Sequence, residues 1–396
     1  MPKDAPLAGY RVLDLTNVLA GPLCCHQLAH LGAEVMKVEN PNGGDLARAL
    51  GADPQRSANG MGVSFLAQNA GKKSIALDLK QPKAKQAFLK LVQTADVLVE
   101  NFRPGVMDRL GLGINDLLPI NPGLIYCAIS GYGQTGPMKN APAYDQIIQG
   151  FSGAMSITGN PESGPLRAGF PIADTVGGLT AAMVISACLS QKTRQARFID
   201  VSMTEALLAT MGWAVSNYLV SGVQPTRMGN DNMTAAPSGT FRTKDGLLNI
   251  AANKQEQWEV LVQTLELSHL ANDPRFATRE ARKINRQALT QELEVRLATQ
   301  PADHWVSEFT KRGIPAGQVL SVPEVLGSAQ TRQRGMIQTH SLADGDISLL
   351  GIGAQIDGQA PSVDTPPPRL NQQGAEILAQ LGYGATEIGE ILKEER

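Results

Sequence analysis

The chain has 396 residues, of which 42% are hydrophobic and 18% are charged, and its formal net charge is -2. This profile is typical of a globular protein and excludes a disordered chain or one that binds nucleic acid through a basic surface. The length exceeds one ordinary hydrophobic core and predicts two domains, or one large domain with an insertion. Because neither a signal peptide nor an uninterrupted apolar span is evident, we expect a cytoplasmic protein without a membrane partner.

The first 130 residues alternate short β-rich runs with helical stretches. Strands are expected at 11–16, 34–39, 74–79, 96–102 and 124–130, and helices at 24–31 and 82–94. This alternation predicts a doubly wound parallel α/β sheet of Rossmann-like type. Such sheets bind ligands beyond the carboxyl ends of their strands, which places four loops on one functional edge: 17–22, 40–45, 80–83 and 101–105.

The rest of the chain changes character after a loop rich in proline, glycine and asparagine. Helices are expected at 174–190 and 200–220, the loop at 224–237, strand-like segments in 239–252 with a turn at 244–246, and helices at 255–265, 286–298, 302–312, 374–381 and 385–393. These boundaries predict a large α/β domain over 1–224, a small α+β domain over 225–325, and a linker with C-terminal helices over 326–396.

Cysteines and histidines give little sign of metal or nucleophilic chemistry. The four cysteines form no CxxC pair and are expected to be small buried side chains. His26 and His30 stand four residues apart on a predicted helix, but no third ligand accompanies them, so we expect no metal and two surface histidines. The chain has no GxSxG elbow, and its histidines lie away from the glycine-rich centre of the sequence, which argues against a histidine-activated serine or cysteine.

A dinucleotide site is also disfavoured. The loop after the first strand carries a single glycine, Gly21, where the GxGxxG fingerprint needs three. Glu39 ends the second strand, where a nicotinamide enzyme would bind the ribose hydroxyls. Without the glycine loop, however, a pyrophosphate has no close approach to the backbone.

Asp174 is the most conspicuous candidate in the glycine-rich segments 130–159 and 169–179. Because it stands at the start of a predicted helix, it could simply be an N-cap. The same position would hold an ionised carboxylate near free N–H groups, where it could act as a nucleophile towards an activated acyl carbon. Tyr144 and Asp145 form a second polar pair, for which a buried core tyrosine is the alternative.

Several sequence blocks match a known family. They are PLAGYRVLDLTNVLAGP, LGAEVMKVENPNGGD, VENFRPGVMDRLGLG, ISGYGQTGP, PAYDQIIQ, ADTVGGL and the closing PPPRLNQQGAEILAQLGY. With these blocks, in this order and over nearly its whole length, the chain resembles the family III CoA-transferases, the CaiB/BaiF group. The resemblance implies a small domain inserted into the large one, C-terminal helices that return to the large domain, and an interlocked homodimer.

The resemblance also assigns roles to individual residues. It implies that Asp174 is the nucleophile, with Tyr144 and Asp145 as further catalytic positions. It places coenzyme A along the predicted sheet edge, against Val18, Leu19, Ala20, Asn40, Leu77, Lys80, Asn101, Phe102, Arg103, Arg109, Leu110 and Met203. Asn40 departs from the arginine that several relatives use for the CoA phosphates. Segment 228–236 has no clear counterpart of the glycine-only loop that covers the aspartate in the formyl-CoA enzyme.

The implied reaction moves CoA from an acyl-CoA, for which we expect succinyl-CoA, to a small carboxylic or dicarboxylic acid. It would proceed through a mixed anhydride and an enzyme thioester at Asp174, without a tightly bound cofactor. Backbone N–H groups of Asp174, Thr175 or residues 18–20 are expected to stabilise the oxyanions. Arg167 is a candidate for holding a second carboxylate, with an ordinary surface arginine as the alternative.

The alternative within the same family is an α-methylacyl-CoA racemase or epimerase. Such an enzyme uses a histidine base whose position corresponds to Tyr144. A tyrosine hydroxyl, with an ordinary pKa of about 10, is a poor base at neutral pH. The residue at this position therefore favours transfer over racemisation, and the presence of Asp174 disfavours a non-catalytic acyl-CoA-binding protein.

Overall fold

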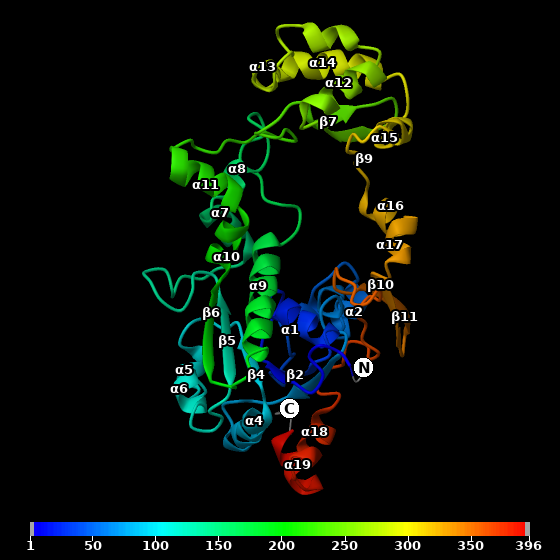
Figure 1. Cartoon of the computed structure of the whole chain (residues 1–396). Coiled ribbons are helices and arrows are strands. Elements are labelled where there is room, and N and C mark those ends of the chain that lie inside the picture. The colour runs from blue at the N-terminus through cyan, green and yellow to red at the C-terminus, as the bar shows by residue number, and fades with distance from the viewer. Residues whose placement is uncertain (1–3, 393–396) are drawn as a thin grey trace. The chain divides into compact units, whose positions relative to one another are not determined.

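The computed structural model describes residues 4–392 (Figure 1). Two compact units are present. The first contains the residues up to Met155, Arg167–Gln224 and those from Ala329 onward, and the second contains Ser156–Leu166 and Pro225–Ser328. The piece 156–166, which the sequence-based boundaries include in the large domain over 1–224, belongs instead to the second unit, and the boundary falls within helix α8 (Ala154–Ile157).

The first unit is built on a six-stranded parallel sheet with the order β3-β2-β1-β4-β5-β6. Its strands are β1 (Arg11–Asp14), β2 (Glu34–Glu39), β3 (Lys72–Ala76), β4 (Val97–Glu100), β5 (Ile125–Ser130) and β6 (Arg197–Ser202). The five strands predicted from the sequence are all confirmed, and β2 has the predicted bounds. This strand order is that of the doubly wound dinucleotide-binding folds.

The predicted helix over 200–220 is wrong at its start. Asp200 lies in β6, where it pairs with Ala128 of β5. The helix begins only after Ser202, whose hydroxyl accepts a hydrogen bond from the N–H of Glu205 at 3.3 Å. The rest divides into α10 (Met203–Thr210) and α11 (Gly212–Ser221). The boundary between β6 and α10 is hard to find in the sequence, because a β-rich run passes directly into a helical one. Only the pairing of β6 with β5 shows where the strand lies.

Helices cover both faces of the sheet, because successive strand residues point to opposite sides. Val12 of β1 packs into one core and Leu13 into the other. The first core includes residues of α1 (Ala20–His30), α7 (Asp145–Phe151), α9 (Ile172–Leu189) and α10. The second includes α4 (Pro82–Thr94), α5 (Val106–Arg109), α6 (Ile114–Leu117), α18 (Gly374–Gln380) and α19 (Ala385–Ile391).

Helix α9 connects the sheet to the candidate site. By length and composition alone it is apolar enough to cross a membrane, with a mean hydropathy of 1.7. It packs against α1, α7 and α10 (Figure 1). Gly177 and Gly178 face these neighbours: a Cβ at Gly178 would lie 2.4 Å from the carbonyl oxygen of Ala20, and one at Gly177 would lie 2.9 Å from Cγ of Met203. The absence of side chains at these two positions lets α9 approach α1 and α10.

The C-terminal segment adds to the β3 side of the sheet. Oδ1 of Asn371 accepts from the N–H of Ala76 at 3.0 Å, and the N–H of Gln373 donates to the carbonyl of Ser74 at 3.0 Å. Helix α19 ends at Ile391, and the last predicted helical residue, Lys393, lies outside the described residues. The remaining elements of this unit are η1 (Leu46–Ala49), α2 (Pro54–Ala58), α3 (Val63–Leu66), α17 (Ala329–Gln333), β10 (Ile337–Leu342) and β11 (Gly345–Leu350).

The second unit contains a three-stranded antiparallel sheet and its own core. The strands are β7 (Ser238–Arg242), β8 (Leu247–Ala251) and β9 (Ala316–Gln318), and the helices are α12 (Gln255–Thr264), η2 (Ser268–Asn272), α13 (Arg279–Ile284), α14 (Arg286–Leu297), α15 (Ala302–Lys311) and α16 (Val322–Gly327). Trp258, Phe276 and Phe309 are buried in its core. The predicted hairpin turn at 244–246 and three charged helices are confirmed.

His26 and His30 are not surface residues, contrary to the expectation from the sequence. The two residues are 3% and 4% exposed, and their ring centroids lie 4.1 Å apart. Burial lowers the pKa of both below the usual value for histidine. Three cysteines are buried as free thiols, as predicted, whereas Cys188 is only partly buried. The inner face of α1 thus accepts imidazole rings as core side chains.

Candidate active site

The strand order creates a crevice between β1 and β4. From β1 the chain adds β2 and β3 on one side of the sheet, and from β4 it adds β5 and β6 on the other side. The connections that follow β1 and β4 therefore lie on opposite faces of the sheet. Reciprocal hydrogen bonds join the two loops: the N–H of Asn17 donates to Oδ1 of Asn101, and Nδ2 of Asn101 donates to the carbonyl of Asn17, both at 2.8 Å. This edge is the one at which the sequence predicts ligand binding.

Two cavities lie along this edge, with volumes of about 360 Å³ and about 220 Å³. The larger one is bounded by the loops after β1, β4 and β5 and by residues of α9 and α10. The smaller one is bounded by the loops after β1, β2 and β3 and by α5. Because Asn17 and Phe102 line both, the two cavities adjoin at the crevice.

Most residues that the resemblance assigns to the ligand lie in these two cavities. The larger cavity is lined by Val18, Leu19, Ala20, Asn101, Phe102, Arg103, Tyr144, Asp174 and Met203. The smaller is lined by Asn40, Leu77, Lys80, Phe102 and Leu110. Arg109 and Asp145 line neither, because Arg109 is exposed on α5 and Asp145 is buried. Lys139, which no sequence motif singled out, also lines the larger cavity.

Asp174 is the third residue of α9 and not its N-cap. Pro171 occupies the N-cap position, so the N-cap explanation of Asp174 is wrong. Within residues 4–392, no hydrogen bond reaches the Asp174 carboxylate, which faces the larger cavity. Burial, together with the nearby negative charge of Asp145, raises the pKa of Asp174 to about 7. The carboxylate is therefore available to a ligand and changes its protonation near neutral pH.

Asp145 binds the N-terminal turn of α9, the helix that carries Asp174. Its Oδ1 accepts hydrogen bonds from the N–H of Ala173 at 2.8 Å and of Asp174 at 3.3 Å, which caps the first turn of α9 from a different helix. Its Oδ2 accepts from Nε2 of Gln149 at 2.6 Å, and Oε1 of Gln149 accepts from the N–H of Ala168 at 2.9 Å. Asp145 is therefore placed to position Asp174 and does not reach the cavity.

Three of the backbone donors expected to stabilise an oxyanion are already engaged. The N–H of Asp174 donates to Asp145, that of Thr175 to the carbonyl of Pro171 at 3.0 Å, and that of Val18 to Oδ1 of Asp45 at 2.9 Å. Leu19 is the N-cap residue of α1 and Ala20 is its first residue, and no side chain caps this helix. Neither of their N–H groups has a partner in the described part of the chain. Both residues line the cavity that contains Asp174.

Glu39 is not available to a ribose. Nε and Nη2 of Arg48 donate to its two oxygens, both at 2.7 Å, and the hydroxyl of Ser74 and the N–H of Asp45 donate at 2.6 and 3.0 Å. These four bonds occupy the acceptor positions of the carboxylate. The structure therefore agrees with the sequence argument against a nicotinamide cofactor.

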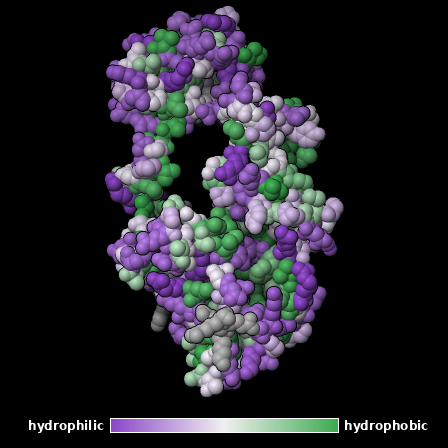
Figure 2. Space-filling model, turned by 180° about the vertical axis from the view of Figure 1, so that it is seen from behind, coloured by the Kyte–Doolittle hydropathy of each residue, from purple (hydrophilic) through white to green (hydrophobic). Residues whose placement is uncertain are grey.

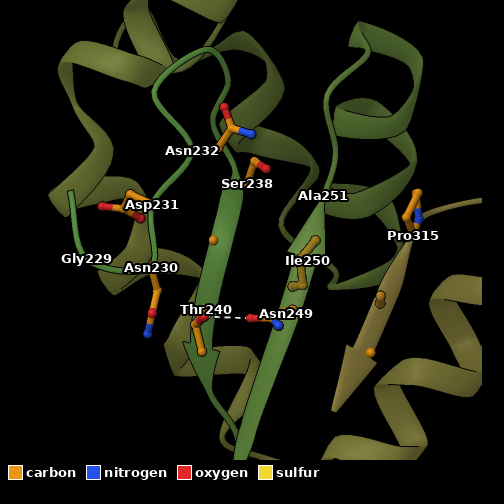
Figure 3. A pocket seen from close by; sticks show the side chains of 13 residues that line it. Gly229, Asn230, Asp231, Asn232, Ser238, Thr240, Asn249, Ile250, Ala251 and Pro315 are labelled. Carbon is orange, nitrogen blue, oxygen red and sulfur yellow. Dashed lines mark hydrogen bonds between the residues drawn. The ribbon is translucent and has the colours of Figure 1, made fainter. Parts of the chain in front are cut away.

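A further pocket of about 600 Å³ lies on the sheet of the second unit (Figure 3). Amide and hydroxyl side chains dominate its lining, and Thr240 donates to Oδ1 of Asn249 at 2.6 Å. Its one charged side chain, Asp231, faces Arg286 at 3.7 Å. The described residues that line it include no cation for a phosphate and no free nucleophile, so the cavities at the sheet edge of the first unit are the candidate active site.

Comparisons with known proteins agree with this choice. The model of the family described as CoA-transferase family III matches residues 7–374. The chain is 36% identical over 386 residues to the succinate–glutarate CoA-transferase of Agrobacterium fabrum, covering 96% of each chain. It is 38% identical over 376 residues to the acetyl-CoA:oxalate CoA-transferase of Acetobacter aceti, covering 94% of this chain and 95% of the relative. A crystal structure of a CAIB/BAIF family protein from Brucella suis matches with a TM-score of 0.83 at 36% identity, covering 95% of this chain and 99% of the other.

Proposed function

The chain belongs to CoA-transferase family III and is an enzyme of that family, and we propose that it transfers CoA between two carboxylic acids through covalent intermediates on Asp174. One observation carries the assignment of Asp174. Its carboxylate lines a cavity at the carboxyl edge of the sheet and accepts no hydrogen bond within the described residues. A nucleophile needs an accessible lone pair of this kind.

The chemistry begins when the Asp174 carboxylate attacks the acyl carbon of the donor thioester. The C–S bond breaks, and a mixed anhydride and CoA thiolate form. The thiolate then attacks the aspartyl carbonyl, which releases the donor acid and leaves CoA bound to Asp174 as a thioester. The acceptor carboxylate repeats these two steps in reverse order, which yields the new acyl-CoA and restores Asp174. The energy of the thioester is thereby conserved.

Each tetrahedral intermediate carries an oxyanion that needs hydrogen-bond donors. The N–H groups of Leu19 and Ala20 are the donors that we assign to this role, because they are unpartnered within residues 4–392 and line the same cavity as Asp174. Leu19 is the N-cap residue of α1 and Ala20 is the first residue of the helix, so both lie at the end where the helix dipole favours negative charge.

Racemisation is not supported by the site. No histidine lines either cavity within the described residues. Tyr144 stands where the racemase would need its histidine, and its side chain is 71% exposed. Among the described residues, a second base opposite Asp174 is therefore missing, and inversion at the α-carbon lacks the group that would return the proton on the other face.

The nucleophilic role predicts a specific pH dependence. Since the pKa of Asp174 is raised to about 7, the value of kcat/KM for acyl-CoA should rise with pH through this range and level off above it, as the carboxylate ionises. Replacing Asp145 by asparagine removes the negative charge that opposes this ionisation. We expect the midpoint of the pH profile of Asp145→Asn to move to lower pH, and initial rates measured between about pH 5 and 9 test this shift.

Gln149→Leu is the matched control for this measurement. It removes the hydrogen bond from Nε2 to Asp145 but retains the charge of Asp145. The midpoint of the pH profile of Gln149→Leu should therefore not move to lower pH as that of Asp145→Asn does. An unchanged midpoint in Asp145→Asn, or a shift to higher pH, would show that Asp174 is not the group that limits the rate.

The substrates that we propose are a succinyl-CoA donor and a small dicarboxylic acceptor. Within the described residues, the charged side chains of the larger cavity are Asp174, Arg103 and Lys139. Arg103 follows Phe102, which lines both cavities, and is assigned to CoA. Lys139 lies in the segment before Tyr144, is exposed and forms no ion pair within residues 4–392. A cation so placed suits the second carboxylate of a diacid. Arg167 is also exposed but lines neither cavity, so it is a weaker candidate.

We also propose a homodimer. Helix α11 has no buried residue, and Trp213, Leu219 and Val220 are 71%, 74% and 87% exposed. Hydrophobic residues reach the surface in several places (Figure 2), and an exposed apolar helix favours coverage by another chain. Sedimentation equilibrium should give twice the mass of one chain. A mass of one chain at micromolar concentration would refute the dimer.

A further inference from the structure

Val18 has a backbone conformation that a valine rarely adopts. Its φ is 67°, in the left-handed region, and a β-branched side chain is strained there. The residue stands between β1 and α1, directly before Leu19 and Ala20. Any force that holds Val18 in this conformation therefore also sets the direction of the two N–H groups that follow it.

Hydrogen bonds hold this loop directly before Val18 and at Val18 itself. Nζ of Lys37 donates to the carbonyl of Thr16 at 2.6 Å, and Asn101 bonds both the N–H and the carbonyl of Asn17. Among residues 4–392, the N–H of Val18 has a single partner, Oδ1 of Asp45 at 2.9 Å. In this part of the chain, Asp45 is thus the one side chain that forms a hydrogen bond with the strained residue.

Asp45 is itself rigidly placed. Asp45 is 1% exposed. Its N–H donates a hydrogen bond to Oε2 of Glu39 at 3.0 Å, and its Oδ1 also accepts one from the N–H of Ala47 at 2.9 Å. Its Oδ2 forms a fully buried ion pair with Nζ of Lys37 at 3.0 Å. A carboxylate fixed at both oxygens can impose a strained conformation on a neighbouring loop.

We propose that Asp45 is a positioning residue: it holds Val18 in the left-handed conformation and so directs the N–H groups of Leu19 and Ala20 into the cavity of Asp174. The proposal rests on the transfer mechanism at Asp174. Asp45 itself does not line either cavity and touches no reacting atom. Its effect should therefore fall on kcat, through the oxyanion donors, and much less on the binding of acyl-CoA.

A matched pair of variants isolates the hydrogen bond. Asp45→Asn and Asp45→Ala both remove the charge that pairs with Lys37, but only the asparagine retains an oxygen for the N–H of Val18. We expect Asp45→Ala to lower kcat by about 10²-fold, the order of one lost oxyanion donor, with KM for acyl-CoA changed by less than about 3-fold. In Asp45→Asn, kcat should fall by less than about 10-fold.

Val18→Gly supplies the second half of the test, because glycine adopts a positive φ without strain. In the Val18→Gly background, the kcat ratio between Asp45→Asn and Asp45→Ala should shrink to about 3-fold or less. Equal kcat values for the two Asp45 variants, or a ratio that is unchanged in the Val18→Gly background, would overturn the proposal.

Thermal unfolding of the same variants distinguishes failure of this proposal from failure of the transfer mechanism. Asp45→Ala should unfold at a lower temperature than Asp45→Asn in the valine background, and the gap should narrow in the Val18→Gly background. This result is independent of any substrate. If Asp45→Ala is insoluble alone but folds with Val18→Gly, the proposal is supported; if both Asp45 variants are insoluble in both backgrounds, Asp45 serves the fold alone and the proposal is wrong.

Discussion

Replacement of Asp174 by alanine is expected to lower the rate of CoA transfer by about 10⁴-fold or more, the order seen when a covalent nucleophile is removed. Without the carboxylate, neither the anhydride nor the enzyme thioester can form, and no other carboxylate lines the larger cavity within the described residues. Mixing enzyme, acyl-CoA and a second acid, with mass detection of the new acyl-CoA, measures the rate.

Two controls separate this loss from damage to the site. Asp174→Asn preserves the size of the side chain and should be as inactive as Asp174→Ala, since an amide is a poor nucleophile. Both variants should still bind CoA in calorimetry, because the assigned CoA positions lie in other loops. Full transfer activity in Asp174→Ala would contradict the mechanism, whereas α-deuterium exchange without transfer would indicate a racemase.

The second large effect is expected at Lys139. Replacing it with methionine removes the positive charge but retains most of the length of the side chain. We expect KM for a dicarboxylic acceptor such as succinate or glutarate to rise by about 10-fold, the order of one hydrogen bond between a charged donor and a carboxylate, because Lys139 is exposed. For a monocarboxylic acceptor such as butyrate, KM should change by less than about 3-fold. Steady-state rates with both acids and one donor measure the difference.

Lys139→Arg and Arg103→Met serve as controls for this prediction. Lys139→Arg retains the charge and should keep most of the preference for the diacid. Arg103→Met should weaken binding of acyl-CoA whichever acid is the acceptor, because we assign Arg103 to CoA. If Lys139→Met changed KM equally for mono- and dicarboxylic acceptors, Lys139 would not bind the second carboxylate.

The sequence was sufficient for the parts of the fold that local periodicity determines. The bounds of β2 (Glu34–Glu39) and α4 (Pro82–Thr94) agree with the prediction residue by residue. The sheet edge also follows from the sequence, because the loops after parallel strands must gather at one side. Residues Asn17 and Asn101 were therefore placed on one edge correctly, although their mutual hydrogen bonds were not foreseen.

Contacts between distant segments explain what the sequence did not reveal. Asp174 looked like an N-cap because the side chain that caps α9 comes from another helix. That side chain is Asp145, which accepts the hydrogen bond from the N–H of Ala173, 28 residues further along the chain. Helix α7, which carries Asp145 and Gln149, was not predicted, although their spacing of four residues was a usable signal. The strained Val18 and the burial of His26 were likewise invisible, since only tertiary packing produces them.

The most direct test of the account is to look for CoA on Asp174. Enzyme incubated with an acyl-CoA that it turns over, without an acceptor acid, should accumulate the enzyme thioester. Peptide mass spectrometry after rapid acid quenching should then find the peptide that contains Asp174 heavier by the mass of CoA less one water, with no such adduct in Asp174→Asn. A turnover-competent enzyme that carries no adduct, or carries it on another residue, would contradict the central claim.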